Sequence, residues 1–358
     1  MRSKRFTAIA IGGVLALSGC AVGGGATSGS GASAGSGADP KVVTVYSADG
    51  LRDGTPNWYQ TEFDAFTKKT GIKVNYVEAG SGEVVSRIAK EKANPQADVL
   101  VTLPPFIQNA AGTGLLQPYT PQGADKVDAS LKDAGAGWYA VVNNYASFIY
   151  NHKTLAEPPK TLTDLLDAKF KGKLQYSTPG QAGDGTAVLI NTMHILGGAD
   201  AAMTYFKKLQ TNNVGPSSST GKLTAKVNHG DLMVANGDVQ MNFAQKSENP
   251  NIEIFFVEDN AGKKTTFALP YCMGLVAGSP NSANGKKLMD FLLSEAAQRD
   301  VSAVGGGFSA RSDVSANDPK GKELTALMAG VSLWEPDWTK INQDVPQLVR
   351  QWQQATGS

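Results

Sequence analysis

Between residues 42 and 102 the sequence alternates repeatedly between buried-strand and helix patterns, and this alternation limits the folds open to the chain. Aromatic side chains recur at helical spacing after the first strand pattern, and an amphipathic helix pattern follows the second. The expected strands cover three ranges: 42–47, 72–77 and 98–101. Strands that alternate with helices predict an α/β fold with a mainly parallel sheet.

Polar residues follow each of these three strands. Ser47 and Asp49 mark the end of the first, Ser81, Gly82 and Glu83 follow the second, and Thr102 follows the third. Because the carboxyl ends of parallel strands meet at one edge of a sheet, where ligands bind, we expect these residues to share one hollow. A helix cap or a satisfied turn would explain any one cluster, but three at equivalent positions favour a ligand.

A second unit is predicted to begin near residue 140. Residues 138–150 are rich in strand formers, and a helix is expected to open at Leu162. A further strand is expected near 174–177, before an apolar helix. Strand character returns near residue 265, and one helix is expected over 288–297.

Four residues of this second unit have the character of an anion site. Gly185 and Thr186 stand at a helix start, as Ser81 and Gly82 do, and Ser177 and Thr178 add hydroxyls. Backbone N–H groups at a helix start favour a phosphate-like group through hydrogen bonds and the helix dipole. None of these clusters contains Lys or Arg, so neutral dipoles would hold the anion.

Carboxylates beside these clusters argue against a simple anion as the ligand. Glu83 and Asp184 adjoin the two helix starts, and their charge would oppose an anion but suit a zwitterion with a nearby ammonium group. Tyr145 and Tyr271 are expected as walls of the cleft. The sequence therefore predicts a small zwitterionic ligand.

Catalytic and cofactor motifs are not found in the sequence. It has no Gly-x-Ser-x-Gly elbow, no Walker lysine loop and no His-Glu-x-x-His, and its three histidines are far apart. We expect no catalytic residue, cofactor or metal site.

The net charge disfavours a nucleic-acid partner. The formal charge of the chain is +1, and loss of residues 1–19, which include Arg2, Lys4 and Arg5, gives +1 − 3 = −2. A surface hydrolase and a structural lipoprotein without a ligand remain as alternatives.

The N-terminus has the pattern of an export signal. A basic start and a short apolar run predict a signal peptide over residues 1–19. The segment Leu17-Ser18-Gly19-Cys20 resembles the bacterial lipobox, which implies lipidation of Cys20; an ordinary secretory signal with an incidental cysteine is the alternative. The Gly/Ala/Ser-rich residues that follow, up to residue 40, are expected to act as a tether. Cys272 is expected to be a buried free thiol.

Residues 41–355 resemble the type II periplasmic solute-binding proteins of the ferric, thiamine and spermidine-like branch. The stretches that carry the resemblance are 45–48, 70–74, 80–83, 96–101 and 307–311. The resemblance implies two α/β lobes with a ligand cleft between them. It implies a discontinuous first lobe (41–140 plus 270–358), a second lobe (141–269), and crossover strands near 138–147 and 265–272.

Within that branch, the sequence looks most like the 2-aminoethylphosphonate-binding proteins. Phe243 and Ala244 stand where ferric binders have a tyrosine pair, so iron is disfavoured. The stretches 46–51, 81–85 and 100–106 are similar to those of the phosphonate binders. The resemblance implies a monomeric binding protein of an ABC importer, with a permease as its partner. Lipidation of Cys20 would anchor it at the outer face of the cytoplasmic membrane, a departure from relatives that are often soluble in the periplasm; a periplasmic location is the alternative. Another phosphonate, a phosphate ester and thiamine remain alternative ligands.

Overall fold

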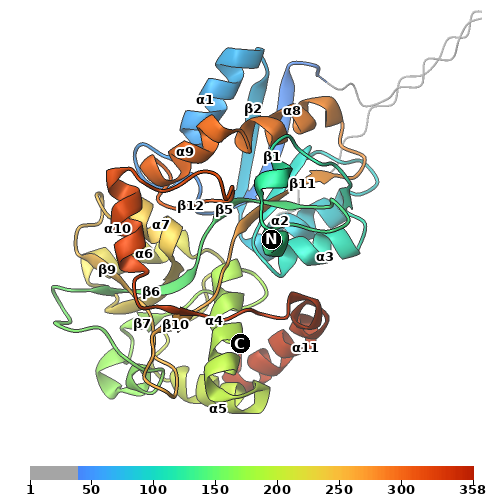
Figure 1. Cartoon of the computed structure of the whole chain (residues 1–358). Helices are drawn as coiled ribbons and strands as arrows, with labels where there is room; N and C mark the ends of the chain where they lie inside the picture. The colour runs from blue at the N-terminus through green and yellow to red at the C-terminus, as the bar shows by residue number, and fades with distance from the viewer. Residues whose placement is uncertain (1–38) are drawn as a thin grey trace, which may run out of the picture. The chain divides into compact units, whose positions relative to one another are not determined.

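The computed structural model describes residues 39–358 (Figure 1). The predicted signal peptide, Cys20 and nearly all of the predicted tether lie outside the described residues. Within 39–358, no helix combines the length and the apolar character that crossing a bilayer requires.

The first lobe is built on a seven-stranded sheet in the order β12-β5-β11-β3-β1-β2, with β4 also pairing with β11. Its strands are β1 (Val42–Ala48), β2 (Lys73–Ala79), β3 (Val99–Thr102), β4 (Leu116–Gln117), β5 (Tyr139–Asn143), β11 (Tyr271–Val276) and β12 (Phe308–Ser309). The pairs β1-β2 and β1-β3 are parallel, as predicted, but β11 runs antiparallel to β3, β4 and β5. The expectation of a mainly parallel sheet is therefore wrong. The sheet is mixed because the chain leaves it along β5 and returns along β11 in the opposite direction.

Helices cover both faces of this sheet. Because side chains alternate along a strand, Val43 and Val45 of β1 pack with α1 (Trp58–Thr70) and α8 (Ser282–Leu292), whereas Tyr46 packs with α2 (Ser81–Lys90) and α3 (Phe106–Gly112). The boundaries of α1 follow from its sequence. The side chain of Asn57 accepts a hydrogen bond from the N–H of Gln60, and Gly71 ends the helix with a φ of 73°.

The single helix expected over 288–297 is two helices, α8 and α9 (Glu295–Ala303). Ser294 separates them and caps α9 by accepting a hydrogen bond from the N–H of Ala297.

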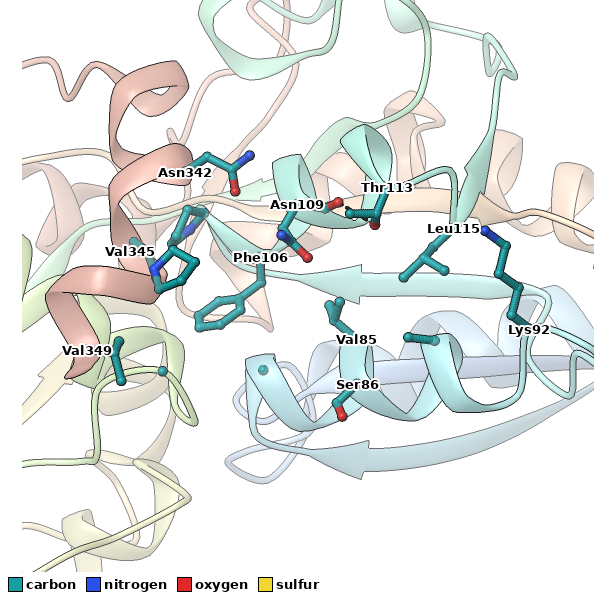
Figure 2. Close-up of a pocket in the computed structure, with 15 residues that line it drawn as sticks. Val85, Ser86, Lys92, Phe106, Asn109, Thr113, Leu115, Asn342, Val345 and Val349 are labelled. Atoms are coloured by element: carbon teal, nitrogen blue, oxygen red, sulfur yellow. Dashed lines mark hydrogen bonds between the residues drawn. The ribbon is translucent and has the colours of Figure 1, made fainter. Parts of the chain in front are cut away.

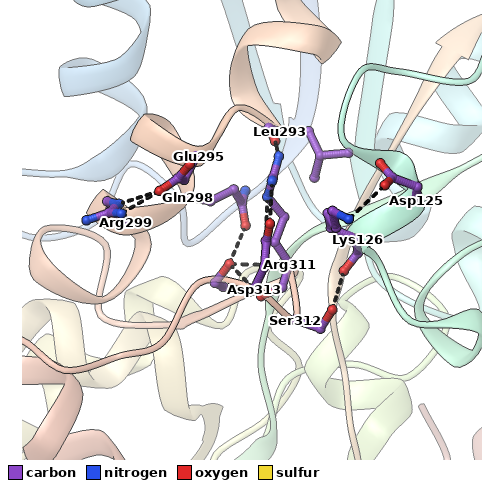
Figure 3. Close-up of polar contacts among 10 residues, drawn as sticks. Asp125, Lys126, Leu293, Glu295, Gln298, Arg299, Arg311, Ser312 and Asp313 are labelled. Atoms are coloured by element: carbon purple, nitrogen blue, oxygen red, sulfur yellow. Dashed lines mark hydrogen bonds and ion pairs between the residues drawn. The ribbon is translucent and has the colours of Figure 1, made fainter.

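The loop after α9 is fixed to helices α8 and α9 by polar contacts (Figure 3). Arg311 donates to the carbonyl oxygen of Leu293 at 3.1 Å and forms a bidentate pair with Asp313. Gln298 Oε1 accepts from the hydroxyl of Ser309 at 2.9 Å. The loop that contributed to the family resemblance is thus fixed by polar contacts within the first lobe.

The second lobe is built on a four-stranded sheet in the order β7-β8-β6-β9. Its elements are β6 (Ala146–Asn151), β7 (Leu174–Gln175), α4 (Gly183–Leu196), α5 (Ala199–Leu209), α6 (Gly221–His229), β8 (Val234–Asp238), α7 (Val239–Gln245) and β9 (Ile252–Phe255). Instead of the helix expected from Leu162, the chain forms two short 3₁₀ turns at Asp164–Leu166 and Ala168–Phe170. Phe170 and Phe206 are fully buried in the core of this lobe, and each contributes roughly 1.5–3 kcal/mol by burial.

Two crossings connect the lobes, in agreement with the predicted two-lobed α/β fold. The stretch predicted as strand-rich divides between two sheets, because β5 ends at Asn143 and β6 begins at Ala146. The return crossing lies between β10 (Thr265–Thr266) and β11, where Tyr145 bridges to Ala268. The carbonyl oxygen of Asn144 accepts a hydrogen bond from the N–H of Leu269 at 2.8 Å, so the two crossings are joined to each other.

Two further helices complete the fold: α10 (Pro319–Leu327) and α11 (Trp338–Thr356), with β13 (Ser332–Leu333) between them paired to β10. Helix α11 contacts both lobes. Trp338 packs on the first core, whereas Leu348 and Trp352 belong to the second core, where Trp352 Nε1 donates to the hydroxyl of Tyr176 at 3.1 Å. The residue boundaries predicted for the two lobes stay a prediction, and α11 contacts both of them.

Candidate functional site

The starts of α2 and α4 face each other where the lobes meet. Ser81 opens α2 and Gly183 opens α4, and a Cβ atom on Gly183 would lie only 2.6 Å from the hydroxyl oxygen of Ser81 and 2.5 Å from Leu103. The N–H of Gly82 donates to the carbonyl oxygen of Gln181 at 2.9 Å. The hydroxyl of Ser81 is buried and has no hydrogen-bond partner. Two helix N-termini and an unpartnered hydroxyl therefore lie together.

Thr102 lies beside the facing starts of α2 and α4, whereas the side chain of Ser47 does not. The Thr102 hydroxyl donates to the carbonyl oxygen of Ser81 at 3.3 Å. Ser47 pairs in register with Val101, so its side chain projects from the opposite face of the sheet to that of Thr102. There its hydroxyl donates to the carbonyl oxygen of Ala48 at 2.8 Å and lies 3.2 Å from the hydroxyl of Tyr59. The structure thus brings two of the three predicted strand-end residues together.

The predicted hydroxyls of the second lobe hold the loop that precedes α4. The Ser177 hydroxyl accepts from Thr220 at 2.9 Å, and the Thr186 hydroxyl accepts from the N–H of Gly180 at 2.9 Å. Thr178 Oγ1 accepts from the N–H of Ser217 at 3.1 Å. A Cβ atom on Gly185 would lie 2.2 Å from the carbonyl oxygen of Ser177, so only glycine fits there. These residues fix the position of the start of α4.

Three buried carboxylates, which we call the aspartate trio, lie in the same region: Asp49, Asp184 and Asp238. Asp49 follows β1 in the first lobe, whereas Asp184 is in the first turn of α4 and Asp238 ends β8, both in the second lobe. Burial, followed by the charges of Asp238 and Asp49, raises the pKa of Asp184 well above its ordinary value. Oδ1 of Asp184 has no hydrogen-bond partner.

The other two members of the trio are partly satisfied. Asp238 accepts hydrogen bonds from the N–H of Met241 at 2.7 Å and from the hydroxyl of Tyr271 at 3.0 Å, and burial raises its pKa to about 6. Asp49 accepts from the hydroxyl of Ser219 at 2.7 Å and from the N–H of Gly221 at 3.3 Å, and burial raises its pKa.

No cation is paired with the trio. The ion pairs found among residues 39–358 all lie elsewhere. Nor does this part of the chain hold three or more His, Cys, Asp or Glu side chains grouped so that they could bind a metal ion. The trio is therefore a buried negative site that lacks a counter-charge, and such sites are costly unless a cation or a proton neutralises them.

The remaining predicted site residues are Glu83, Tyr145 and Tyr271, and they differ in whether they contact the aspartate trio. Glu83 is exposed, and its carboxylate accepts a hydrogen bond from the N–H of Gly80 at 3.2 Å, which caps its own helix. Tyr145 is half-buried and packs edge-on against Phe308. Tyr271 is fully buried, and its hydroxyl is 3.0 Å from both the carbonyl oxygen of Asp49 and the carboxylate of Asp238. Of these three, Tyr271 alone contacts the trio.

Sequence reasoning grouped Asp49 with Ser47 at a strand end but assigned it no ligand contact, and it did not select Asp238. Asp49 stands directly after the first strand in a turn, and Asp238 precedes α7 as its N-cap. Both positions carry the strand-end signal that selected Thr102. The carboxylates were missed because turn and cap positions give aspartate an ordinary structural role.

A groove of about 580 Å³ lies between α2, α3 and α11, and Gly82 of the candidate site is among the residues that line it (Figure 2). Figure 2 shows Phe106 from α3 and Val345 and Val349 from α11 at one part of its wall, with Val85 of α2 nearby. The groove is mostly apolar, and no member of the aspartate trio lines it. Cys272 is a buried free thiol, as expected, and burial raises its pKa well above the ordinary value.

Comparison with known proteins agrees with this architecture. The chain is 53% identical over 317 residues to a Salmonella paratyphi A protein named "Putative 2-aminoethylphosphonate-binding periplasmic protein", covering 88% of this chain and 93% of that one. It is 26% identical over 298 residues to iron uptake protein A1 of Synechocystis, covering 79% of each. The structure of AfuA from Actinobacillus pleuropneumoniae with fructose-6-phosphate bound superposes with a TM-score of 0.75 at 24% identity, covering 88% of this chain and 99% of that one.

A family model described as bacterial extracellular solute-binding protein matches residues 62–329. This match spans most of both sheets and includes Asp184, Asp238 and Tyr271. The two-lobed fold, the site where the lobes meet and these similarities lead to one conclusion: the chain belongs to the bacterial extracellular solute-binding protein family and serves as the solute-binding protein of an ABC importer.

Proposed function

We propose that this protein binds 2-aminoethylphosphonate between its lobes and delivers it to the permease of its importer, without catalysing a reaction. The aspartate trio is the observation that carries the proposal. Three buried carboxylates with no paired cation call for a positive ligand group, and a primary ammonium offers one charge and three hydrogen-bond donors. The name of the 53%-identical Salmonella protein supports the same ligand.

The ammonium group is assigned to the trio, with Asp184 as its main partner. Asp184 is 2% exposed and its Oδ1 is unpartnered, whereas each of the other two already accepts hydrogen bonds from protein donors. Glu83 is not assigned to the ammonium, because its carboxylate is exposed and caps α2. Tyr271 holds Asp238 in place and closes one side of the site.

The phosphonate is assigned to the facing starts of α2 and α4. Ser81 offers a free hydroxyl, and the first-turn N–H groups of both helices carry partial positive charge. Gly82 and Thr102 adjoin Ser81, while Ser177, Thr178, Gly185 and Thr186 support the start of α4. Ser47 is left out of this assignment, because its hydroxyl lies on the other face of the sheet.

Binding is proposed to close the lobes about the two crossings at Asn144–Tyr145 and 267–270. The bound state would then be the form that the permease recognises, which is a ligand-driven shift of population. Export and anchoring through a lipid on Cys20, with the following Gly/Ala/Ser-rich residues as a tether, complete the proposal.

Isothermal titration calorimetry tests the ligand directly. 2-Aminoethylphosphonate should bind, while ethylphosphonate, which lacks the amine, and ethanolamine, which lacks the phosphonate, should each bind at least tenfold more weakly. A thermal-shift panel with phosphate esters and thiamine covers the alternative ligands, because a ligand at 100 times its dissociation constant adds about 2.7 kcal/mol of stability. Absence of binding at millimolar 2-aminoethylphosphonate would refute the assignment.

A further inference from the structure

The aspartate trio is assembled from both lobes. Asp49 belongs to the turn after β1, whereas Asp184 and Asp238 belong to the second lobe. The hydroxyl of Tyr271 lies 3.0 Å from both the carbonyl oxygen of Asp49 and the carboxylate of Asp238. Burial, with the charge of Asp49 as a further cause, raises the pKa of Asp184 and of Asp238. Closing the lobes therefore brings one carboxylate up to two others in a buried space. Without a cation, that approach costs free energy, because the carboxyl groups must either repel one another where water is excluded or take up protons.

The same carboxylate also holds the lobes together. Asp49 accepts hydrogen bonds from Ser219 and from Gly221, which opens α6 of the second lobe. Asp49 thus has two opposed effects on closure: its hydrogen bonds favour closure with any ligand, while its charge disfavours closure unless a cation is present.

Unpartnered acceptors beside the trio point to a cationic donor as the missing component. Oε1 of Gln240 is buried and without a partner, and it lies 3.3 Å from the Cβ position of Gly50, the neighbour of Asp49. Oδ1 of Asp184 is also unpartnered. Buried acceptors without donors are costly, so each of these atoms would be stabilised by a ligand group that brings N–H donors.

We propose that Asp49 is a specificity-determining residue that makes closure of the lobes conditional on a positively charged ligand. The proposal rests on the proposed function only in placing the ligand in this cleft. An anion without an amine would meet the helix starts but leave the three buried acidic groups without a counter-charge. Such an anion would bind weakly because closing the lobes around it costs free energy, in addition to the hydrogen bonds that its missing amine cannot make.

Other charged groups around Asp49 add to the same field. Asp53 lies on the same turn and accepts a hydrogen bond from Gln245 of the second lobe at 2.8 Å. Burial, followed by the charges of Asp49, Glu78 and Asp238, raises the pKa of Asp53 well above its ordinary value. Asp53 is therefore a further acidic group beside Asp49 that no cation in the described part of the chain offsets, and it adds to the cost of closing the lobes without a positively charged ligand.

The test compares 2-aminoethylphosphonate with ethylphosphonate in three proteins: wild type, Asp49→Asn and Ser219→Ala. The asparagine keeps an acceptor for Ser219 and Gly221 but removes the charge. We expect it to lower the affinity ratio of the two ligands at least tenfold, mainly through tighter binding of ethylphosphonate. Ser219→Ala removes the donor and keeps the charge, so both affinities should fall alike and the ratio should stay within about twofold.

Small-angle X-ray scattering gives a readout that does not depend on the ligand. Ligand-free Asp49→Asn should have a smaller radius of gyration than the ligand-free wild type. Ser219→Lys places an ammonium group beside Asp49. It should also lower the affinity ratio of the two ligands and reduce the radius of gyration of the ligand-free protein. It therefore provides a second test if Asp49→Asn folds poorly. If Asp49→Asn and Ser219→Lys both had the same ratio of affinities for 2-aminoethylphosphonate and ethylphosphonate as the wild type, the inference would be overturned. Failure of the wild type to bind 2-aminoethylphosphonate would instead refute the proposed function and leave the scattering comparison valid.

Discussion

The hydroxyl of Tyr271 lies 3.0 Å from the carboxylate of Asp238, and so joins β11 of the first sheet to the end of β8 in the second. The same hydroxyl is 3.0 Å from the carbonyl oxygen of Asp49. A Cβ atom on Gly50 would lie 2.0 Å from this hydroxyl, so the turn after β1 is closely fitted around it. Tyr271 is therefore the contact through which both lobes support the trio.

Tyr271→Phe is expected to weaken 2-aminoethylphosphonate binding on the order of tenfold, because Asp238 loses a donor that orients it, and a hydrogen bond to a charged group contributes about 1.5–3 kcal/mol. Calorimetry measures the loss. Tyr145→Phe is the matched control and should bind like the wild type, since Tyr145 packs on Phe308 away from the trio. Equal affinities in both variants would contradict the role given to Tyr271.

Asp184→Asn and Glu83→Gln separate the two carboxylates that the sequence offered for the ammonium. We expect the first to weaken binding by at least tenfold, because a buried carboxylate loses its charge. The second should change affinity by less than about twofold, since Glu83 is exposed, already accepts from the N–H of Gly80, and is not among the carboxylates assigned to the ammonium. If Glu83→Gln proved the more damaging change, the ammonium assignment would be wrong.

Gly183→Ala should prevent full closure without harming either lobe. The added methyl group would meet Ser81 and Leu103 of the first lobe, while alanine is well tolerated at the start of a helix. The expected result is a loss of affinity greater than tenfold, with little change in the melting temperature of the ligand-free protein. Gly112→Ala in α3 is the control, because nothing lies within 4 Å of the Cβ position there. Wild-type affinity in Gly183→Ala would show that the lobes do not approach this closely in solution.

Glu62 on α1 gives a prediction for stability against pH. It is 3% exposed, and burial together with nearby Asp300 raises its pKa to about 8 from 4.5. The native state thus holds a proton that the unfolded chain has lost between these values. Its contribution to stability is fully present below pH 4.5 and is lost as the pH rises through 8.

Glu62→Gln is uncharged at every pH, so it should melt higher than the wild type at pH 9, by on the order of 2 °C, and almost equally at pH 4.5. Differential scanning calorimetry across this range measures the difference. Asp64→Asn, an exposed change on the same helix, should show no such trend. A constant difference at all pH values would show that Glu62 is not the titrating group.

Much of the first lobe follows from local sequence signals. The helix over residues 58–70 has its N-cap at Asn57 and its stop at Gly71, and both are visible in the sequence. The predicted two-lobed α/β fold is confirmed. The antiparallel course of β11 could not be predicted from these signals, because β11 pairs with strands more than 100 residues earlier in the chain. Ser294 illustrates a local signal that was overlooked, since a serine before Glu295 is an ordinary N-cap.

In the candidate site, too, local sequence signals identified some residues and could not identify others. Ser81, Thr102 and Asp184 come from strand ends and helix starts, and the structure places all three where the lobes meet. Ser47 was grouped with them because it ends a strand, but the two-residue alternation of side chains turns it to the other face of the sheet. The trio depends on contacts between distant segments, so no local pattern could reveal that its members meet.

Helix α11 limits the path along which the lobes can separate. Its end is fixed in the second core by Leu348 and Trp352, while Val345 and Val349 border the groove against α3 (Figures 1 and 2). Separation must release one of these faces, and the buried bond from Trp352 to Tyr176 makes the α3 face the weaker one. We therefore expect the C-terminal helix to travel with the second lobe and to leave α3 uncovered, so that a fluorophore on Asn109 would report each cycle of uptake and release.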